Sequence, residues 1–150
     1  VSQVTRDISK LVSNSFKANV ESIRSLSESI WILSGGFREV ILPIVSEFGI
    51  SDQHVLANSF LYDGDRVIGC DKSSDLFQDQ GKIKAIKRLS LAQDIIMVGD
   101  GYTDYEVFDR GVSSEFICYT ENITRENVLS RSTLSASSFS EMLDIIRDLK

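Results

Sequence analysis

The stretch Ile95-Ile96-Met97-Val98-Gly99-Asp100-Gly101-Tyr102-Thr103-Asp104 decides the fold class of this chain. Its first four residues form a short, continuous apolar run, which is typical of a strand buried on both faces of a parallel sheet. The run stops at Gly99-Asp100-Gly101 and leaves a carboxylate at the end of the strand. A buried carboxylate is costly unless it is paired or binds a cation. The stretch therefore predicts a cation-binding acid at a strand end, with Asp104 close enough along the loop to support it.

Toward the N-terminus, residues 30–33 form a second apolar run, which ends at Ser34-Gly35-Gly36. Helical spacing follows over residues 40–48, and Pro43 within it predicts a kink or a late start. Residues 55–62 and 66–70 flank Asp63-Gly64-Asp65, which predicts a β-hairpin with a tight turn. Two amphipathic stretches before residue 27 predict further helices.

Helices and strands continue to alternate in the second half of the chain. Gly81-Lys82 opens a helix, residues 105–110 form a short helix closed by Gly111, and residues 116–119 form a third strand. Ser138 with Glu141 predicts the capped start of a terminal helix, and the serine-rich residues 130–140 are expected to be a loop. This alternation predicts an α/β fold, a three-layer Rossmann-like, mainly parallel sheet with a small hairpin, in a single domain spanning residues 1–150.

Composition excludes several classes of protein. The 150 residues are 42% hydrophobic with a net charge of -6, so a packed core is feasible and a broad nucleic-acid-binding surface is not. Cys70 and Cys118 lie far apart and His54 is the single histidine, which excludes a disulfide framework and a zinc cluster. No apolar run approaches the length of a membrane span and no secretory signal precedes the first helix, so we expect a cytoplasmic protein without a membrane partner.

Three groups of residues are candidates for chemistry. Ser34-Gly35-Gly36 before a helix resembles an anion cradle, although glycines also serve ordinary strand-to-helix turns. Lys82 lies in a first helical turn, where a cation is unfavourable without a nearby anion, although it also belongs to a basic helix face. Asp100 suits Mg²⁺, whose ligands are carboxylates, waters and phosphate oxygens, although an Asp-Gly turn beside a helix cap has the same sequence.

The order of these groups resembles the haloacid dehalogenase-like phosphatase superfamily, and within it the phosphoserine phosphatases. The resemblance rests on residues 32–38, Ile-Leu-Ser-Gly-Gly-Phe-Arg, and residues 96–104, Ile-Met-Val-Gly-Asp-Gly-Tyr-Thr-Asp, with Gly81-Lys82 between them. It covers residues 16 to 119 and implies a magnesium-dependent hydrolase of a small phosphomonoester such as phosphoserine.

The resemblance implies a role for each residue on the phosphate side of the site. Ser34 would hydrogen-bond the transferring phosphoryl group, and Gly35 and Gly36 would offer backbone N–H groups to the substrate phosphate. Lys82 would neutralise the phosphate and the nucleophilic carboxylate. Arg38 would either contact a substrate carboxylate or lie on a solvated helix face.

On the metal side, the resemblance implies that Asp100 ligates Mg²⁺, that Thr103 contacts the substrate and that Asp104 supports the metal site. Ser34, Lys82 and Asp100 would then be the catalytic residues of this chain.

One family motif is missing from the sequence. The family's nucleophile is the first aspartate of a D-x-D-x-T/S motif at the end of the first strand, and Asp63-Gly64-Asp65 has that spacing only within the predicted hairpin. We therefore expect the C-terminal part of a phosphoserine phosphatase-like enzyme, inactive alone and holding Mg²⁺ weakly or not at all. The alternative is a non-catalytic binding or interaction module derived from such a phosphatase.

The missing motif also has a structural consequence. In the family's sheet the first strand lies between the strand that ends at Ser34 and the strand that ends at Asp100. Without it, each of these strands has an unpaired edge, which favours self-association through the sheet edges.

Overall fold

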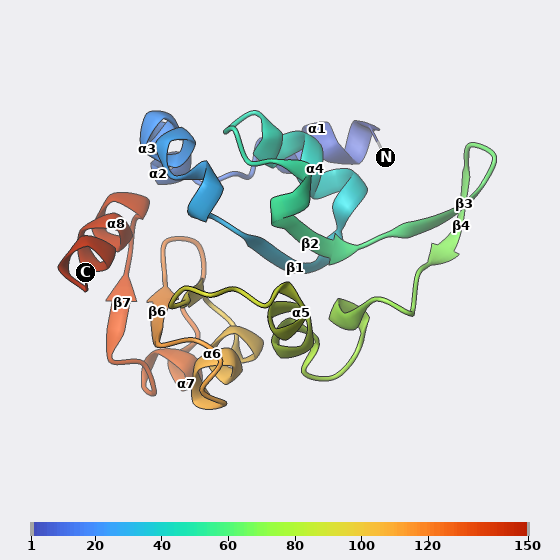
Figure 1. The fold of residues 1–150 in the computed structure, drawn as a ribbon. Helices are drawn as coiled ribbons and strands as arrows, with labels where there is room; N and C mark the ends of the chain where they lie inside the picture. Colours follow the sequence, from blue (N-terminus) through green and yellow to red (C-terminus); the bar gives the residue numbers. More distant parts are fainter. Residues whose placement is uncertain (1, 150) are drawn as a thin grey trace. The chain divides into compact units, whose positions relative to one another are not determined.

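The computed structural model describes residues 2–149 and divides the chain into two compact units (Figure 1). Unit 1 comprises the chain up to Val12 together with Val20–Ala85. Unit 2 comprises Ser13–Asn19 together with the chain from Ile86 onward. No described helix is both long and apolar enough to cross a bilayer.

Unit 1 contains two pairs of strands. β1 (Ile32–Phe37) pairs in parallel with β2 (Val55–Asn58), and β3 (Phe60–Asp63) pairs antiparallel with β4 (Arg66–Cys70). The helices are α1 (Ser2–Ser9), α3 (Val20–Ser25), α4 (Arg38–Ser46) and the first part of α5 (Gly81–Leu89), with 3₁₀ turns η1 (Ser27–Ser29), η2 (Asp52–His54) and η3 (Asp75–Phe77).

Unit 2 is built on a three-stranded parallel sheet in the order β5 (Ile96–Gly99), β6 (Glu115–Tyr119), β7 (Leu134–Ala136). Its further helices are α2 (Asn14–Ala18), α6 (Tyr102–Asp109), α7 (Glu126–Leu129) and α8 (Phe139–Asp148). α6 packs against β5 and β6, and α8 packs against β7. The predicted mixed α/β fold with parallel strand pairing is confirmed, while the single domain stays a prediction.

Buried apolar side chains come from helices and strands of both units, whereas Ile8 and Leu11 of the first predicted amphipathic stretch are 40% and 77% exposed. In unit 1 they are Ile23, Val40, Ile44, Val45, Phe48, Ile50, Val55, Ile83 and Ala85. In unit 2 they are Ile86, Met97, Val107, Phe116, Ile117, Cys118, Val128, Ala136, Phe139, Met142 and Leu143. Burial of such side chains is the main favourable contribution to folding, and both strand runs and helix stripes supply it here.

Two predicted strand assignments were wrong in detail. Residues 55–62 do not form one hairpin strand, because the chain leaves β2 at Ser59 and continues as β3 in a different pair. The serine-rich residues 130–140 are not only a loop, because β7 lies within them and pairs with β6. Both errors concern which strand pairs with which, and pairing depends on residues distant in sequence.

Helix boundaries also differ from the predicted ones. α4 begins at Arg38, so Pro43 lies inside the helix and does not delay its start. α6 begins at Tyr102 rather than Tyr105, so Thr103 and Asp104 belong to its first turn. Ser138 caps α8 as predicted, since its Oγ accepts the Glu141 N–H at 3.2 Å.

β1 and β5 are in different sheets among the described residues. β1 pairs with β2 alone, and β5 pairs with β6 alone, so each has one unpaired edge.

Candidate functional site

The Ser34-Gly35-Gly36 segment lies inside β1 and not after it, as the sequence had suggested. The register with β2 shifts between Ser34 and Phe37, so the chain bulges at the two glycines. Ser34 Oγ accepts the Gly36 N–H at 3.0 Å. The Gly36 N–H is therefore satisfied within the segment and would have to exchange partners to bind a phosphate.

One polar side chain bonds this bulge, and a second bonds the start of β3. Asn58, 4% exposed at the end of β2, donates from Nδ2 to the Gly35 carbonyl at 2.9 Å. Glu39, in the first turn of α4, accepts the Phe60 N–H at 3.0 Å. Buried polar groups that bond backbone in this way fix the local geometry because losing the bond leaves a buried group unsatisfied. Sequence reasoning missed both residues.

Lys82 lies in the first turn of α5, as predicted. Gly81, which opens the helix, is buried beneath η3, and a Cβ at Gly81 would overlap the Asp75 carbonyl and approach Leu76 Cα to 2.8 Å. The glycine is thus explained by close backbone contact. Its neighbour Lys82 is half-buried at a helix start.

The Arg38 side chain contacts residues in and directly after η2. Its guanidinium forms an ion pair with the Asp52 carboxylate and donates to the backbone carbonyls of Val55 and of Asp52. Through these polar contacts, Arg38 connects the start of α4 with the segment before β2. Whether Arg38 also contacts a substrate carboxylate stays a prediction.

Asp100 follows β5 directly, at the carboxyl end of the parallel sheet of unit 2, as the sequence predicted. Its carboxylate forms an ion pair with the guanidinium of Arg125, the residue that precedes α7. Both side chains are partly exposed, at 42% and 44%. Arg125 was not predicted from the sequence. The feature that could have identified it is a cation in the loop after the next parallel strand, because such loops meet at one edge of the sheet.

Asp104 has a different environment. It is 6% exposed and its Oδ2 accepts the Gly101 N–H at 3.1 Å, closing the first turn of α6. A Cβ at Gly99 would overlap the Asp104 carboxyl group, so this glycine makes room for the cap. Asp104 thus acts as a helix cap, the alternative that the sequence left open, and Thr103 is exposed on the same turn.

The residues around Asp100 fit a divalent cation in donor type. A carboxylate at a strand end, already paired with a cation, has the hard oxygen that Mg²⁺ prefers. Among residues 2–149 there is no group of three or more His, Cys, Asp or Glu side chains that could hold a metal. Mg²⁺ at Asp100 would therefore have at most two such side chains of the described residues and complete its shell with water or phosphate oxygens.

A second carboxylate lies beyond the end of β6. Glu121 Oε2 accepts hydrogen bonds from the Ser15 and Tyr119 hydroxyls, both at 2.5 Å, and Oε1 accepts the Ser15 N–H at 3.2 Å. The hydroxyl of Ser15, and then that of Tyr119, lower the pKa of Glu121 to about 2. Ser15 Oγ also accepts the Phe139 N–H at 2.9 Å. This network ties α2 to β6 and α8.

The structure places the predicted site residues in two groups. Ser34, Gly35, Gly36 and Lys82 belong to unit 1, and Asp100, Thr103 and Asp104 belong to unit 2. Within each group, the strand or helix position agrees with the sequence, apart from the corrections above. That the two groups converge on one substrate stays a prediction.

Parallel strand pairs, with a hydroxyl within β1 and a carboxylate directly after β5, define an α/β protein. The family model for haloacid dehalogenase-like hydrolase matches residues 10–109. The chain belongs to this family.

Three known proteins illustrate the likeness. The chloroplastic phosphoserine phosphatase of Arabidopsis thaliana is 30% identical over 83% of this chain and 44% of its own length. The phosphoserine phosphatase of Homo sapiens is 30% identical over 93% of this chain and 60% of its own length. A phosphoserine phosphohydrolase-like protein of Francisella tularensis aligns with a TM-score of 0.78 at 27% identity, over 95% of this chain and 68% of that one. The chain thus spans about half the length of the first relatives.

Proposed function

We propose that this chain forms the C-terminal, phosphate- and metal-binding part of a magnesium-dependent phosphomonoester hydrolase that acts on phosphoserine or a similar small phosphate ester. The observation that carries the proposal is the Asp100 carboxylate, paired with Arg125 and partly exposed at the carboxyl end of β5 in a chain of this family. Ligands of parallel α/β proteins bind at that edge. We place the protein in the cytoplasm, without nucleic-acid or membrane partners.

Each proposed role follows from the chemistry of the residue. Ser34 would donate its hydroxyl hydrogen to a phosphoryl oxygen, and the backbone N–H groups of Gly35 and Gly36 would bind the phosphate once Gly36 leaves Ser34. Lys82 would balance phosphate charge from the start of α5. Preorganised donors of this kind stabilise charge that develops in phosphoryl transfer.

On the metal side, Asp100 would ligate Mg²⁺, which when bound offsets the negative charge of the phosphate. Thr103 would contact the substrate from the exposed first turn of α6. Asp104 would support the site by fixing the Gly101 turn that carries Asp100.

The full reaction needs a nucleophile that these residues do not supply. An aspartate from a segment outside this sequence would attack phosphorus and form an aspartyl phosphate while the ester oxygen leaves with a proton from an acid. Water would then hydrolyse the acyl phosphate to inorganic phosphate and regenerate the carboxylate. This chain alone would accordingly hydrolyse no phosphoserine.

A second candidate function is a non-catalytic binding or interaction module. Two contacts favour it: Arg125 already neutralises Asp100, and Ser34 already binds the Gly36 N–H. A site whose polar groups are satisfied internally can persist without substrate.

The two candidates separate in one pair of experiments. With Mg²⁺ and phosphoserine, the purified chain should release no phosphate, while inorganic phosphate should shift the amide signals of Gly35, Gly36 and Lys82 in NMR spectra. A chimera that adds the unmatched part of the human relative should hydrolyse phosphoserine and lose that activity in Asp100→Asn. A folded but inactive chimera, together with no phosphate shifts, would support the binding module instead.

A further inference from the structure

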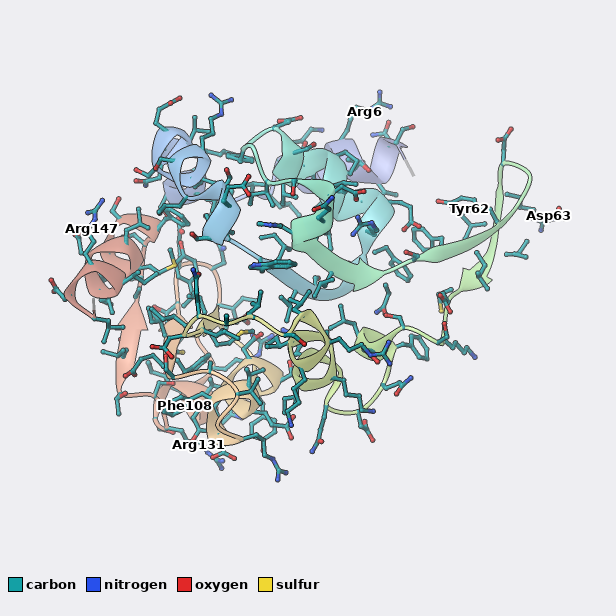
Figure 2. All side chains as sticks on the ribbon, viewed as in Figure 1. Arg6, Tyr62, Asp63, Phe108, Arg131 and Arg147 are labelled. Atoms are coloured by element: carbon teal, nitrogen blue, oxygen red, sulfur yellow. The ribbon has the colours of Figure 1, made fainter. Side chains whose placement is uncertain are left out.

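The β3–β4 hairpin projects away from α4 and the β1–β2 pair of unit 1 (Figure 1). Figure 2 shows Tyr62 and Asp63 near its outer end. The hairpin exposes four large apolar side chains, of which Ile68 is the most exposed at 61%; the others are Leu61, Tyr62 and Val67. A two-stranded hairpin is marginally stable by itself, so this apolar ribbon would gain from a further partner.

β4 also has an unpaired edge. One side of β4 is hydrogen-bonded to β3, and among the residues that the structure describes no other strand pairs with it. The base of the hairpin is anchored, because Phe60 stacks on Phe37 with ring centroids 3.8 Å apart. The ribbon is therefore a fixed edge with open backbone N–H and C=O groups, which is a template for pairing with another strand.

The charges along this edge are complementary to those of a second, antiparallel copy of the same edge. Residues 65–72 read Asp-Arg-Val-Ile-Gly-Cys-Asp-Lys, with an acid and a base at each end and uncharged residues between. In an antiparallel alignment with Ile68 opposite Gly69 of a second copy, Asp65 lies opposite Lys72 and Arg66 lies opposite Asp71. Each opposite-charge pair occurs twice, since the alignment is symmetric. Opposite charges across strands stabilise pairing, and like charges oppose it.

The bulge in β4 makes this alignment possible. Phe60 pairs with Cys70 and Tyr62 with Val67, so Val67 and Cys70 share one face of the hairpin although they are three residues apart. The register shift at Ile68 causes this change of alternation.

Arg66 and Asp71, which oppose each other in the proposed alignment, also share one face of the hairpin. Arg66 pairs with Asp63, and Asp71 donates its N–H to the Ser59 carbonyl at 2.9 Å, so Arg66 and Asp71 share the opposite face. Directly opposed residues in an antiparallel pair must point to the same face. In a regular strand, residues that differ by an odd number would not satisfy this requirement.

We propose that β4 is a self-association edge, and that a second copy of this chain pairs with it antiparallel to form a four-stranded sheet in the order β3-β4-β4-β3. The arrangement is a two-fold, isologous contact with Ile68 near its axis. This contact covers the exposed apolar side chains of the hairpin. It also provides hydrogen-bond partners for the unpaired backbone N–H and C=O groups of β4. It is independent of the catalytic proposal, because it uses none of the candidate site residues.

Charge exchange tests the alignment. The dimerisation of the 150-residue chain would be measured by sedimentation equilibrium for the parent, Asp65→Lys, Lys72→Asp and the double variant. Each single variant places like charges opposite each other twice, so its dissociation constant should rise by about fivefold or more. The double variant restores opposite charges and should return to near the parent value. All these positions are exposed, so circular dichroism should report an unchanged fold.

A cysteine pair tests the register directly. Val67→Cys would lie opposite Cys70 of the second copy and should form an intermolecular disulfide on mild oxidation, seen as a dimer on a non-reducing gel. Val67→Cys combined with Cys70→Ser lacks the opposed pair and should form much less dimer. Cys118 is 1% exposed and contributes little.

Three results would overturn the proposal. One is a parent chain that stays monomeric at every concentration. Another is a dimer that the single charge variants leave unchanged or that the double variant does not restore. The third is stronger association in Asp65→Lys or Lys72→Asp than in the parent, which would mean that the charges protect the edge from pairing.

Discussion

The guanidinium of Arg125 pairs with the carboxylate of Asp100, so a cation from the loop after β6 neutralises the acid at the end of β5. The carboxylate that we propose as the Mg²⁺ ligand is thus paired with a cationic side chain of the same unit. Both partners are partly exposed, and such ion pairs contribute about 0–1 kcal/mol. The pair is weak enough to open when a stronger cation or a phosphate competes for either partner.

Replacement of Arg125 should strengthen metal binding. In Arg125→Gln the cation that competes for Asp100 is gone, so the Mg²⁺ affinity should rise about two- to fivefold, the value of an exposed ion pair. Isothermal titration calorimetry or NMR titration would measure it. Arg131→Gln, an exposed arginine of the same unit, is the matched control and should leave the affinity unchanged. An unchanged or weaker affinity in Arg125→Gln would show that the ion pair does not compete with the metal.

Asp100, and not Asp104, should be the direct ligand of Mg²⁺. The Asp104 carboxylate is buried and bonded to the Gly101 N–H, whereas that of Asp100 is partly exposed. Mg²⁺ should shift amide signals around Asp100, and Asp100→Asn should abolish the shifts. Asp104→Asn, which keeps an oxygen acceptor for the cap, should retain them. Shifts centred on Asp104 or on the β3–β4 hairpin would contradict the assignment.

Gly99→Ala should destabilise the fold at the turn that carries Asp100. The added Cβ would overlap the Asp104 carboxyl group and displace it from the Gly101 N–H. Overpacking of this kind costs about 1–3 kcal/mol. Thermal or urea unfolding would measure the loss. Gly35→Ala is the comparison, since a Cβ there meets nothing within 4 Å; equal losses in both variants would exclude the steric explanation.

Glu121 should make the stability depend on acid pH. The hydroxyls of Ser15 and Tyr119 lower its folded-state pKa to about 2, below the ordinary 4.5. A lowered pKa contributes stability that is present above the ordinary value and is lost as the pH falls from about 4.5 toward 2. Unfolding midpoints of the parent and Glu121→Gln should differ at pH 7 and converge near pH 2.

Two controls accompany this measurement. Ser15→Ala should raise the pKa of Glu121 in an NMR titration, because it removes the hydroxyl with the largest effect. Glu126→Gln alters an exposed carboxylate in the same unit and should shift the unfolding midpoint little at either pH. A parent and Glu121→Gln that stay equally far apart at low pH would show that the carboxylate's charge is not what stabilises α2.

Local sequence was sufficient for the approximate position of both apolar strands, for two of the helix starts and for the motif order. Apolar runs at residues 30–33 and 95–98, Gly81 at a helix start and Ser138 as a cap depend on neighbours in the chain, so periodicity and residue type predict them. The same local signals place Asp100 at a strand end, and the motif order indicates the family.

Tertiary structure alone decided the partners of those residues. Arg125 reaches Asp100 from the next loop, Ser59 ends the pairing of β2, and β7 forms in a serine-rich stretch because β6 offers it an edge. Each outcome depends on backbone and charge contacts between distant parts of the chain, and the free energy of such contacts is not encoded in any short window of sequence.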